Sequence, residues 1–378
     1  LKGEDVSVVI WTTTPWTIPA NLAIALHPDM EYAAVKTDKY GVLIMAAELV
    51  ENVMAAAGVK DYKTLVIFKG SVLEKLKARH PLYERESLLI LADFVTLDTG
   101  SGCVHIAPGH GVEDYEIGKV YGLEVYAPVD NDGKFTKEVE DFAGRFVFDA
   151  NEDVNKALSA KGALLNASAY AHSYPYCWRC KQPIIFRSTW QWLISMEASD
   201  LRRKALAAID RVRWIPDWGR DRIYNMILNR PDWCISRQRA WGVPIPVFYC
   251  KDCGELLLSG EVAEHVAKIF EKEGSDAWFA REAKDLLPPG TVCQACGKTA
   301  IEKEADIVDV WFDSGVSYAA VCEHDPKLGV PVDMYLEGSD QHRGWFHSTL
   351  LAAVGTRGDA PYKAVLTHGF VVDGEGKK

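Results

Sequence analysis

Six of the nine cysteines in this sequence stand in three pairs, each with two residues between the thiols. Cys250 pairs with Cys253 and Cys293 with Cys296, and a glycine follows each of these two pairs. A two-residue gap lets both thiolates bind one metal ion from a tight turn, and four thiolates close a tetrahedral zinc site. We therefore predict a structural zinc ion here. The alternative is that surface thiols share this spacing by coincidence.

The third pair, Cys177 and Cys180, has the same gap but no second half. Either it is the relic of a metal site, or its partner ligands lie outside the chain. The remaining cysteines are isolated and are more typical of small buried hydrophobic residues.

Hydroxyl groups gather in the stretch WTTTPWTIPAN, residues 11–21, directly after the strand-like run Val6–Ile10. Hydroxyls donate and accept hydrogen bonds, although strand propensity and turn chemistry would also explain threonines at this place. The four are Thr12, Thr13, Thr14 and Thr17. Pro15 and Pro19 fix φ and remove ladder donors, which predicts a rigid, extended segment after the strand.

The elements that must position these groups differ between the two halves of the chain. Residues 1–170 are predicted to form one β-rich α+β domain. Its strand-like runs are Val6–Ile10, Tyr32–Val35, Gly41–Met45, Thr64–Lys69, Leu88–Val95, Cys103–Ala107 and Ala163–Asn166, and its helices are expected near Ala46–Ala57 and Asp149–Lys161.

The second half is predicted to contain strand, turn and helix units. The apolar spacing at Val262, Val266, Ile269 and Phe270 indicates a helix between the two cysteine pairs, with Gly274 as its C-terminal stop.

A strand is expected at Met334–Glu337, followed by a helix that Ser339 or Asp340 can cap, and then by another strand within residues 363–374. Polar residues at the carboxyl end of such a strand are where open α/β sheets bind ligands.

The composition is that of a globular protein of two or three domains, with 378 residues, 48% of them hydrophobic and 25% charged. Apolar runs are far shorter than the roughly 20 residues of a membrane span, so a cytoplasmic protein without a membrane segment is expected. Because the chain starts at Leu1 and ends in GEGKK, we expect a fragment of something longer.

The net charge of −11 argues against general coating of a polyanion. Charge is uneven, however, since residues 201–242 hold ten basic residues against four acidic ones, a local balance of +6. A solvated helical face is one explanation, and phosphate contact with a nucleic acid or nucleotide is the other.

Seven segments resemble the class I aminoacyl-tRNA synthetases, and within them the isoleucyl-tRNA synthetases. They follow one another in family order across nearly the whole chain. The segments are WTTTPWTIPAN (11–21), GSGCVHIAPGHGVEDYEIGKVYGLE (100–124), HSYPYCWRCKQPIIFRST (172–189), NRPDWCISRQRAWGVPIP (229–246), DVWFDSG (309–315), EGSDQHRGWFHS (337–348) and LTHGFVVDGEGKK (366–378).

The resemblance implies an α/β fold in two parts. Residues 1–170 correspond to a barrel-like editing domain without its first strands, and residues 171–378 to the second half of a Rossmann-type catalytic domain with a zinc-ribbon-like insert at 247–304. The family's HIGH-type ATP signature would precede the chain, and its KMSKS-type ATP loop would begin within or just after Lys377 and Lys378. We therefore expect that this chain does not itself form the aminoacyl-adenylate, and that the missing upstream part explains the orphan pair Cys177 and Cys180.

An editing site suits the chemistry of the first part. A pocket that binds isoleucine cannot reject valine well, because one methylene is worth only about 1–3 kcal/mol of binding energy, and isoleucine-selecting synthetases are the standard example. The resemblance assigns His105 as the wall that excludes the larger side chain and Asp114 as the anchor of the α-ammonium group. The threonines at 12, 13, 14 and 17 would hold a water and the terminal ribose, with Asn21 beside them.

Each role has a plainer alternative. His105 could be a satisfied core histidine on its strand, and Asp114 could be a charge or cap at the start of a helix. No Ser-His-Asp or Cys-His set is apparent, so direct attack by an oriented water is expected.

In the second part the resemblance assigns isoleucyl-adenylate contacts to Trp241, Glu337, Gln341 and Trp345. Two indoles can sandwich an aliphatic side chain. The alternative is that these residues are core tryptophans and helix caps.

The resulting prediction is a segment of an enzyme that ligates isoleucine to tRNA(Ile), with a deacylase site for Val-tRNA(Ile). Isoleucine, valine, ATP with Mg²⁺ and tRNA(Ile) are the expected ligands of the parent enzyme, which is expected to be a monomer. The alternative function is a non-catalytic, zinc-stabilised module that binds tRNA through the basic stretch.

Overall fold

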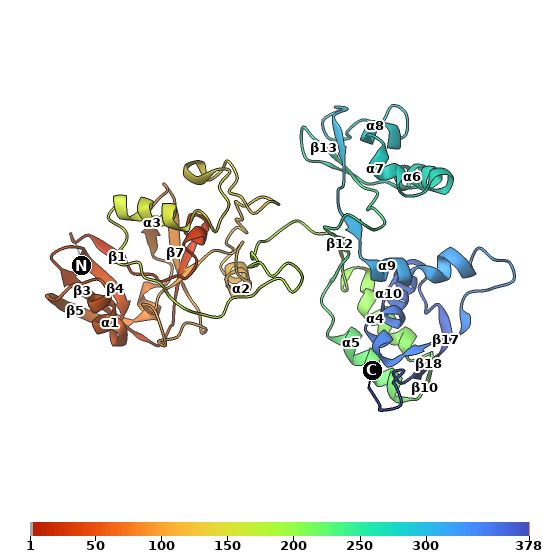
Figure 1. Ribbon diagram of the computed structural model, residues 1–378, viewed down its shortest axis with the longest axis horizontal. Coiled ribbons are helices and arrows are strands. Elements are labelled where there is room, and N and C mark those ends of the chain that lie inside the picture. The colour runs from red at the N-terminus through yellow and green to blue at the C-terminus, as the bar shows by residue number, and fades with distance from the viewer. Residues whose placement is uncertain (1–2, 378) are drawn as a thin grey trace. The chain divides into compact units, whose positions relative to one another are not determined.

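The computed structural model describes residues 3–377, so Leu1, Lys2 and Lys378 lie outside the described part of the chain. The chain divides into two compact units, one up to Thr189 and one from Trp190 onward. Figure 1 shows strands and helices in both units, a mixed α/β architecture with several small sheets. The coarse α/β prediction is therefore confirmed.

The first sheet of the N-terminal unit has the order β1-β4-β3-β5. Its strands are β1 (Val6–Val8), β3 (Glu31–Thr37), β4 (Gly41–Ala46) and β5 (Tyr62–Lys69). β3 and β4 form an antiparallel pair in which Thr37 faces Gly41, and Gly41 has φ +67°, a conformation that glycine adopts without steric cost. β1 pairs with β4 in parallel.

The second sheet of this unit has the order β6-β7-β2-β8. Its strands are β2 (Ala23–Leu26), β6 (Lys77–Arg79), β7 (Glu86–Leu91) and β8 (Val104–Ile106). β2 lies at the centre and is buried along its whole length, since it pairs with β7 on one side and with β8 on the other. It holds β8 in register, with Ile24 opposite His105.

Helices and 3-10 turns complete the N-terminal unit. They are η1 (Pro15–Ala20), η2 (Ala47–Leu49), α1 (Val50–Ala56), η3 (Gly70–Leu73), α2 (Val112–Val120), η4 (Glu140–Phe142) and α3 (Asn151–Ala160). η1 is tied to α3 because the Trp16 amide donates to Asn151 Oδ1 at 3.0 Å.

Three local predictions for this unit were wrong. The segment after Thr14 is a 3-10 helix instead of an extended segment, because Pro15 stands at its first turn, where a fixed φ suits a helix start. No strand forms at Ala163–Asn166, and the strand expected to reach Val95 ends at Leu91. β2 and β6 were missed, since a short alanine-rich run and a lysine–arginine run give weak strand signals.

The main sheet of the C-terminal unit is parallel, with the order β10-β18-β17. Its strands are β10 (Arg213–Ile215), β17 (Val332–Gly338) and β18 (Tyr362–His368), and the helices of the same core are α4 (Leu201–Ile209), α5 (Trp218–Leu228), α9 (Val310–Gly315) and α10 (Trp345–Arg357). α10 connects β17 to β18, the helical crossover that a parallel pair requires. It is buried along its middle, with Phe346, Leu350 and Val354 in the core.

The predicted cap of that helix was wrong. Residues Ser339–His342 form a separate 3-10 turn, η7, and α10 begins only at Trp345, after Gly344. The two strands around it were predicted correctly.

A smaller core in the same unit surrounds the paired cysteines. Its strands are β13 (Phe248–Cys250), β14 (Leu256–Leu257) and β15 (Ile301–Lys303), in the order β14-β13-β15, and its helices are α6 (Gly260–Glu273), α7 (Ala277–Ala280) and α8 (Ala283–Leu286). α6 begins at the cap Ser259, whose hydroxyl accepts from the Val262 amide, and ends at Gly274, as predicted.

The remaining elements of this unit are short. They are β9 (Leu193–Ile194) with β11 (Trp233–Cys234), β12 (Ser236–Arg237) with β16 (Ile307–Val308), the 3-10 turn η5 (Ala198–Asp200) and the π-helical turn η6 (Tyr318–Cys322). Within residues 3–377 no helix combines the length and the apolar character needed to cross a membrane.

Candidate functional site

A cavity of about 340 Å³ opens in the N-terminal unit. Three segments build it: the stretch from Trp11 into η1, the loop before β8 together with β8 itself, and the turn that leads into the first turn of α2. Of the predicted residues, Thr12, Thr13, Thr14, Thr17, His105 and Asp114 line it. Segments nearly 100 residues apart in the sequence therefore meet at one hollow.

His105, from the buried strand β8, has both ring nitrogens in hydrogen bonds. Nδ1 lies 2.7 Å from Asn21 Nδ2, and Nε2 lies 2.9 Å from Thr17 Oγ1. Asn21 Nδ2 also donates to the Ala23 carbonyl, which can only accept, while Asn21 Oδ1 accepts from Ser87 Oγ. The amide is thereby oriented, so His105 Nδ1 accepts and Nε2 carries the proton.

His105 is neutral and held in place. Burial, with smaller contributions from His80, His110 and Arg85, lowers the pKa of His105 to about 3. Only 7% of the residue is exposed. A neutral ring with both nitrogens occupied cannot accept a further proton, so it presents a fixed surface to the cavity.

The threonines continue this network. Thr17 Oγ1 donates to the Thr14 carbonyl at 2.8 Å, and Thr12 Oγ1 accepts from the Thr14 amide at 3.0 Å. The hydroxyl of Thr14 lies 3.2 Å from that of Thr12. Among the described residues the Thr13 hydroxyl has no hydrogen-bond partner, so it is available to a ligand.

Asp114 stands in the first turn of α2, where Gly111 is the N-cap residue. Its Oδ2 accepts from the Ala107 amide at 2.7 Å, so it links α2 to the end of β8 instead of capping its own helix. Burial raises the pKa of Asp114 to about 6, opposed by the hydrogen bond from Ala107. A carboxylate that is costly to ionise in this cavity is suited to a cationic ligand.

Several lining residues were missed by sequence reasoning. The loop before β8 contributes Phe94, Thr96 and Thr99, and the turn before α2 contributes His110. His110 had a signal, since it lies in the same GHG segment as the start of α2. The three loop residues had no signal in the sequence, because only the tertiary fold brings their loop next to Trp11.

A second cavity, of about 390 Å³, lies in the C-terminal unit at the carboxyl end of β17. The predicted residues Glu337, Gln341 and Trp345 line it, together with residues that were not predicted: Trp311, Ser314 and Ser317. Trp311 and Ser314 had a signal, since both lie in the DVWFDSG segment, whereas Ser317 lies just beyond it.

Trp345 is fixed from two sides. Its ring stacks on Tyr335 with centroids 4.0 Å apart, and its Nε1 donates to the Ser314 carbonyl at 3.1 Å. Gln341 Oε1 accepts from the Trp345 amide. One face of this indole is therefore already covered.

Trp241 does not join this group. Its side chain is 93% exposed, and it is not among the residues that line the cavity. Trp311 provides the second indole there. The structure thus brings Trp311 and Trp345 together at this cavity and places Trp241 outside its lining.

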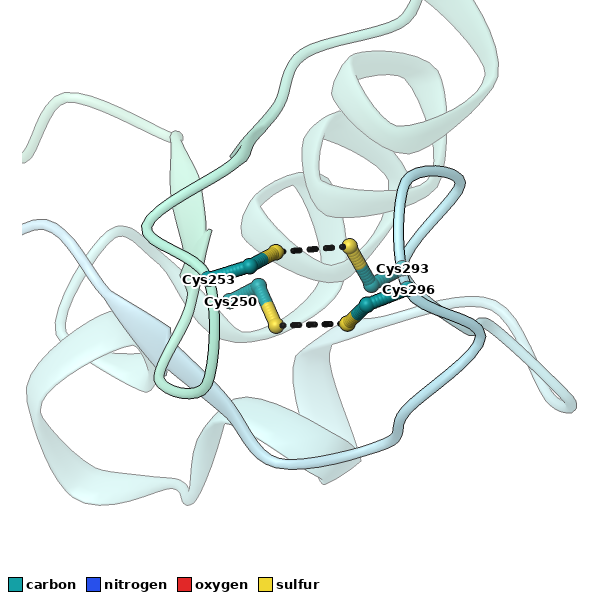
Figure 2. Close-up of side chains that lie close together, drawn as sticks. All are labelled: Cys250, Cys253, Cys293 and Cys296. Carbon is teal, nitrogen blue, oxygen red and sulfur yellow. Dashed lines mark hydrogen bonds between the residues drawn. The ribbon is translucent and has the colours of Figure 1, made fainter.

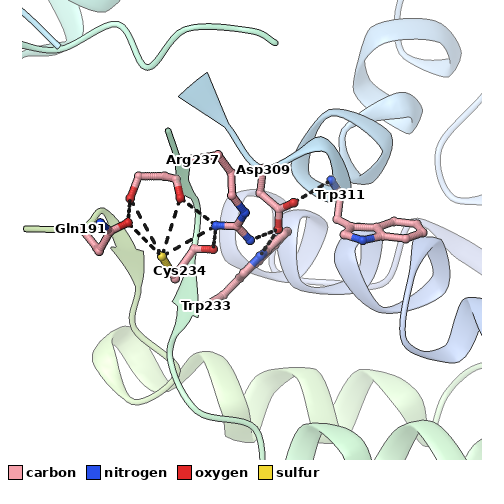
Figure 3. A network of polar contacts seen from close by, with 7 residues as sticks. Gln191, Trp233, Cys234, Arg237, Asp309 and Trp311 are labelled. Atoms are coloured by element: carbon pink, nitrogen blue, oxygen red, sulfur yellow. Dashed lines mark hydrogen bonds and ion pairs between the residues drawn. The ribbon is translucent and has the colours of Figure 1, made fainter. Parts of the chain in front are cut away.

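A polar network at the start of α9 positions Trp311 (Figure 3). Asp309, only 5% exposed, accepts from the Trp311 amide and from Trp233 Nε1, and pairs with Arg237 at 2.9 Å. Arg237 in turn donates to the carbonyls of Cys234 and Ser236. The carboxylate thus joins β11, β12 and the helix that lines the second cavity.

The four paired cysteines come together as predicted (Figure 2). Cys250 Sγ lies 3.5 Å from Cys296 Sγ, and Cys253 Sγ lies 3.5 Å from Cys293 Sγ. All four sulfur atoms lie within 4.8 Å of one another. A tetrahedral site with metal–sulfur bonds of about 2.3 Å has sulfurs about 3.8 Å apart, so this cluster fits one metal ion.

The Cys250–Cys253 and Cys293–Cys296 pairs lie in turns of the same backbone geometry. Gly254 and Gly297 have φ of +74° and +72°, and their amides donate to the carbonyls of Cys250 and Cys293. The glycines are needed because this left-handed conformation is unfavourable for other residues.

The third pair folds into the same turn. Lys181 takes the glycine's place with φ +56°, and its amide donates to the Cys177 carbonyl at 2.9 Å. Within the described residues, however, Cys177 and Cys180 belong to no group of three or more possible metal ligands.

Half of the basic stretch is neutralised by neighbouring carboxylates. Among its ten basic residues the ion pairs involve Arg202, Arg203, Arg211, Arg220 and Arg237. The positive charge available to a polyanion is therefore smaller than the sequence count of +6 indicates.

Comparison with known proteins supplies the family. The profile described as "tRNA synthetases class I (I, L, M and V)" matches residues 5–378. The isoleucine–tRNA ligases of Geobacter sulfurreducens and Syntrophotalea carbinolica are 61% and 60% identical over the whole chain, and that of Moorella thermoacetica is 57% identical over 98% of it.

The chain spans about 41% of the length of the first two relatives. A solved structure described as "The crystal structure of GlLeuRS-CP1" is 18% identical with a TM-score of 0.37, over 45% of this chain and 87% of that one.

Proposed function

This chain belongs to the class I tRNA synthetases, and on that basis we propose that it is part of an isoleucine–tRNA ligase whose first cavity hydrolyses valine misattached to tRNA(Ile). Residues 1–170 would be the editing domain. Residues 171–378 would be the second half of the Rossmann-type catalytic domain, with a zinc-binding insert at 247–304.

The observation that carries this proposal is the fixed, neutral His105 in a cavity that also contains the ionisable Asp114. An aminoacyl ester brings an α-ammonium group and an aliphatic side chain. Asp114 would bind the ammonium, since a carboxylate close to a cation gains most where water is excluded. His105 would limit the space for the side chain, because its two hydrogen bonds prevent the ring from moving aside.

The threonines would hold the ribose and the attacking water. Thr13 and Thr14 lie on the cavity wall, and Thr13 has a hydroxyl that no described residue engages. Water held beside the ester carbonyl attacks it directly, which gives free valine and tRNA without a covalent intermediate. Preorganised hydroxyls serve this step because they need not reorient during the reaction.

The second cavity would form part of the isoleucyl-adenylate site. Trp311 and Trp345 offer apolar surface for an aliphatic side chain, while Glu337 and Gln341 supply polar groups at the end of β17. The proposed ligands of the whole enzyme are isoleucine, ATP with Mg²⁺ and tRNA(Ile). It would act as a monomer in the cytoplasm.

The cysteine cluster would hold a structural zinc ion. Four thiolates fill a tetrahedral site, so the metal would have no open position for catalysis. Its role would be to close the small core that contains α6, α7 and α8.

Deacylation tests the proposal directly. The chain is incubated with Val-tRNA(Ile) and, separately, with Ile-tRNA(Ile), and release of the labelled amino acid is followed. We expect release of valine but not of isoleucine, and loss of valine release in Asp114→Ala. Unchanged hydrolysis in that variant would remove the role given to Asp114.

A different outcome would favour a non-catalytic module. In that case the chain binds tRNA with a steep salt dependence and leaves Val-tRNA(Ile) intact. The ion pairs within the basic stretch argue against this alternative.

A further inference from the structure

The N-terminal unit contains three buried histidines whose ring nitrogens are used differently. His80 Nε2 donates to the Ile18 carbonyl, and its Nδ1 accepts from the amides of Leu82 and Tyr83. His105 also has both nitrogens occupied. Neither ring has a lone pair left for a ligand.

His110 is different because one of its nitrogens stays free. Its Nδ1 lies 3.0 Å from the Phe186 carbonyl, which can only accept, so Nδ1 carries the proton. The lone pair is therefore on Nε2, which has no hydrogen bond to any residue within 3–377. The ring packs edge-on against Trp16 and lines the same cavity as His105 and Asp114.

The surroundings of His110 favour the neutral, unprotonated imidazole. Burial is the main cause that lowers the pKa of His110, with Arg187 acting in the same direction. The imidazole is therefore neutral near pH 7, and its Nε2 can accept a proton at the pH at which the cell works.

We propose that His110 is the general base of the first cavity and takes a proton from the water that attacks the ester. The inference rests on the proposed function, since it names a catalytic group for that same hydrolysis. Neither the threonines nor His105 can serve in this way, because hydroxyls are poor bases and the nitrogens of His105 are occupied.

The step balances within the cavity. His110 Nε2 accepts one proton as the water oxygen bonds to the carbonyl carbon. The tetrahedral intermediate then expels the ribose oxygen, and the imidazolium returns the proton to it. The products are the free amino acid and the tRNA hydroxyl, and the histidine is regenerated.

The variant His110→Asn tests this role. An asparagine amide can reach the position of Nδ1 and keep the bond to the Phe186 carbonyl, but it places no base at Nε2. We expect deacylation of Val-tRNA(Ile) under single-turnover conditions to slow by 100-fold or more, about the contribution of a general base, with little change in tRNA affinity. His27→Asn, the same substitution away from the cavity lining, is the matched control.

Imidazole rescue separates catalysis from structure. In His110→Ala the ring is absent, and added imidazole should restore a large part of the lost rate. A folded His110→Ala variant that imidazole does not accelerate would show that His110 only shapes the cavity, which overturns the inference.

The remaining outcomes are distinguishable. If the unaltered chain deacylates Val-tRNA(Ile) and His110→Asn keeps a rate within about 3-fold of it, the inference fails and the proposed function stands. If the unaltered chain leaves Val-tRNA(Ile) intact, both fail.

Discussion

His105 and Asp114 show opposite relations between a single residue and its surroundings. His105 is buried and both of its ring nitrogens are hydrogen-bonded, so its ring cannot take up a proton or move and contributes only a fixed wall to the cavity. The Asp114 carboxylate accepts from the Ala107 amide but is still costly to ionise, so a nearby cation would stabilise its charged form. At the scale of residues, the first cavity thus combines a fixed neutral group, His105, with a carboxylate that can bind a cation.

The cost of ionising Asp114 predicts a pH-dependent gain in stability for Asp114→Asn. Asn can still accept from the Ala107 amide. The pKa of Asp114 is raised from 3.8 to about 6 in the folded chain, so the free energy of unfolding falls as pH rises through that interval. Above it the folded chain carries a penalty of about 1–3 kcal/mol for the ionised carboxylate. The variant should therefore melt several degrees higher than the unaltered chain at about pH 8 and nearly equally at about pH 3, by calorimetry.

The same variant should lose deacylation of Val-tRNA(Ile), because a neutral amide cannot bind an ammonium group strongly. A variant that is no more stable at about pH 8 would contradict the account of the raised pKa.

Ser87 offers a test of the wall role proposed for His105. Its Oγ donates to Asn21 Oδ1, and Asn21 holds His105. Ser87→Ala leaves that buried oxygen unsatisfied, at a cost of about 1–3 kcal/mol, and lets the asparagine turn. We expect measurable deacylation of Ile-tRNA(Ile) in this variant, measured beside Val-tRNA(Ile). A preserved preference for valine would mean that another group forms the wall.

At the scale of elements, a carboxylate near the start of a short helix ties that helix to its neighbours at each of the two cavities. α9 starts at Asp309, whose side chain joins it to β11 and β12 (Figure 3). α2 starts where Gly111 leaves room for Asp114, since a Cβ at position 111 would stand 2.9 Å from its Cγ. Both helices are held by contacts with residues outside their own turns.

Asp309→Ala should destabilise the C-terminal unit and disorder the second cavity. The change removes the helix cap and leaves the Trp233 indole nitrogen and Arg237 without their carboxylate partner. A cost of about 1–3 kcal/mol is expected for leaving the buried Trp233 donor unsatisfied, while Arg237 is 39% exposed and can be solvated. Urea denaturation, with hydrogen exchange of α9 as the local measurement, checks this.

Lys363→Ala is a suitable control, because its ion pair with Asp333 is fully exposed on both sides and should contribute little. A loss for Asp309→Ala no larger than that of the control would contradict the role of the network.

At the scale of the whole molecule, the chain folds around several separate hydrophobic cores. The two compact units have their own hydrophobic clusters, and the cluster around Phe248 and Trp278 contains Cys250 and Cys293 themselves. This small core combines three short strands with the 14-residue helix α6 and two single-turn helices. The proposed metal ion would cross-link the two cysteine turns of this core and so add to its stability.

Removal of the metal should unfold only this small core. Metal binding to four thiolates is worth roughly 10 kcal/mol in small domains, so a chelator should remove exchange protection from α6 and β13. Deacylation by the N-terminal unit should continue at an unchanged rate. Elemental analysis should find one zinc per chain, and Cys253→Ser should abolish it.

Loss of deacylation in parallel with the metal would contradict the separation of the two cores. Cys322→Ser, a change at a cysteine outside the cluster, controls for the loss of a thiol.

The sequence by itself determined the features that depend only on neighbouring residues. Two-residue gaps and following glycines predicted the cysteine turns, and apolar spacing with Gly274 predicted α6, because neighbouring residues have few ways to arrange themselves. Motif order predicted the family. Short strands such as β2 were missed because their stability comes from neighbours on both sides.

Only the tertiary structure decided which residues meet. It brought His110 and the loop before β8 to the first cavity, and Trp311 rather than Trp241 to the second. It also determined which histidine nitrogen is free, since that depends on carbonyl groups such as that of Phe186, which are distant in the sequence. The physical reason is that burial and hydrogen-bond partners are properties of the packed chain, and the sequence lists only the groups that can take part.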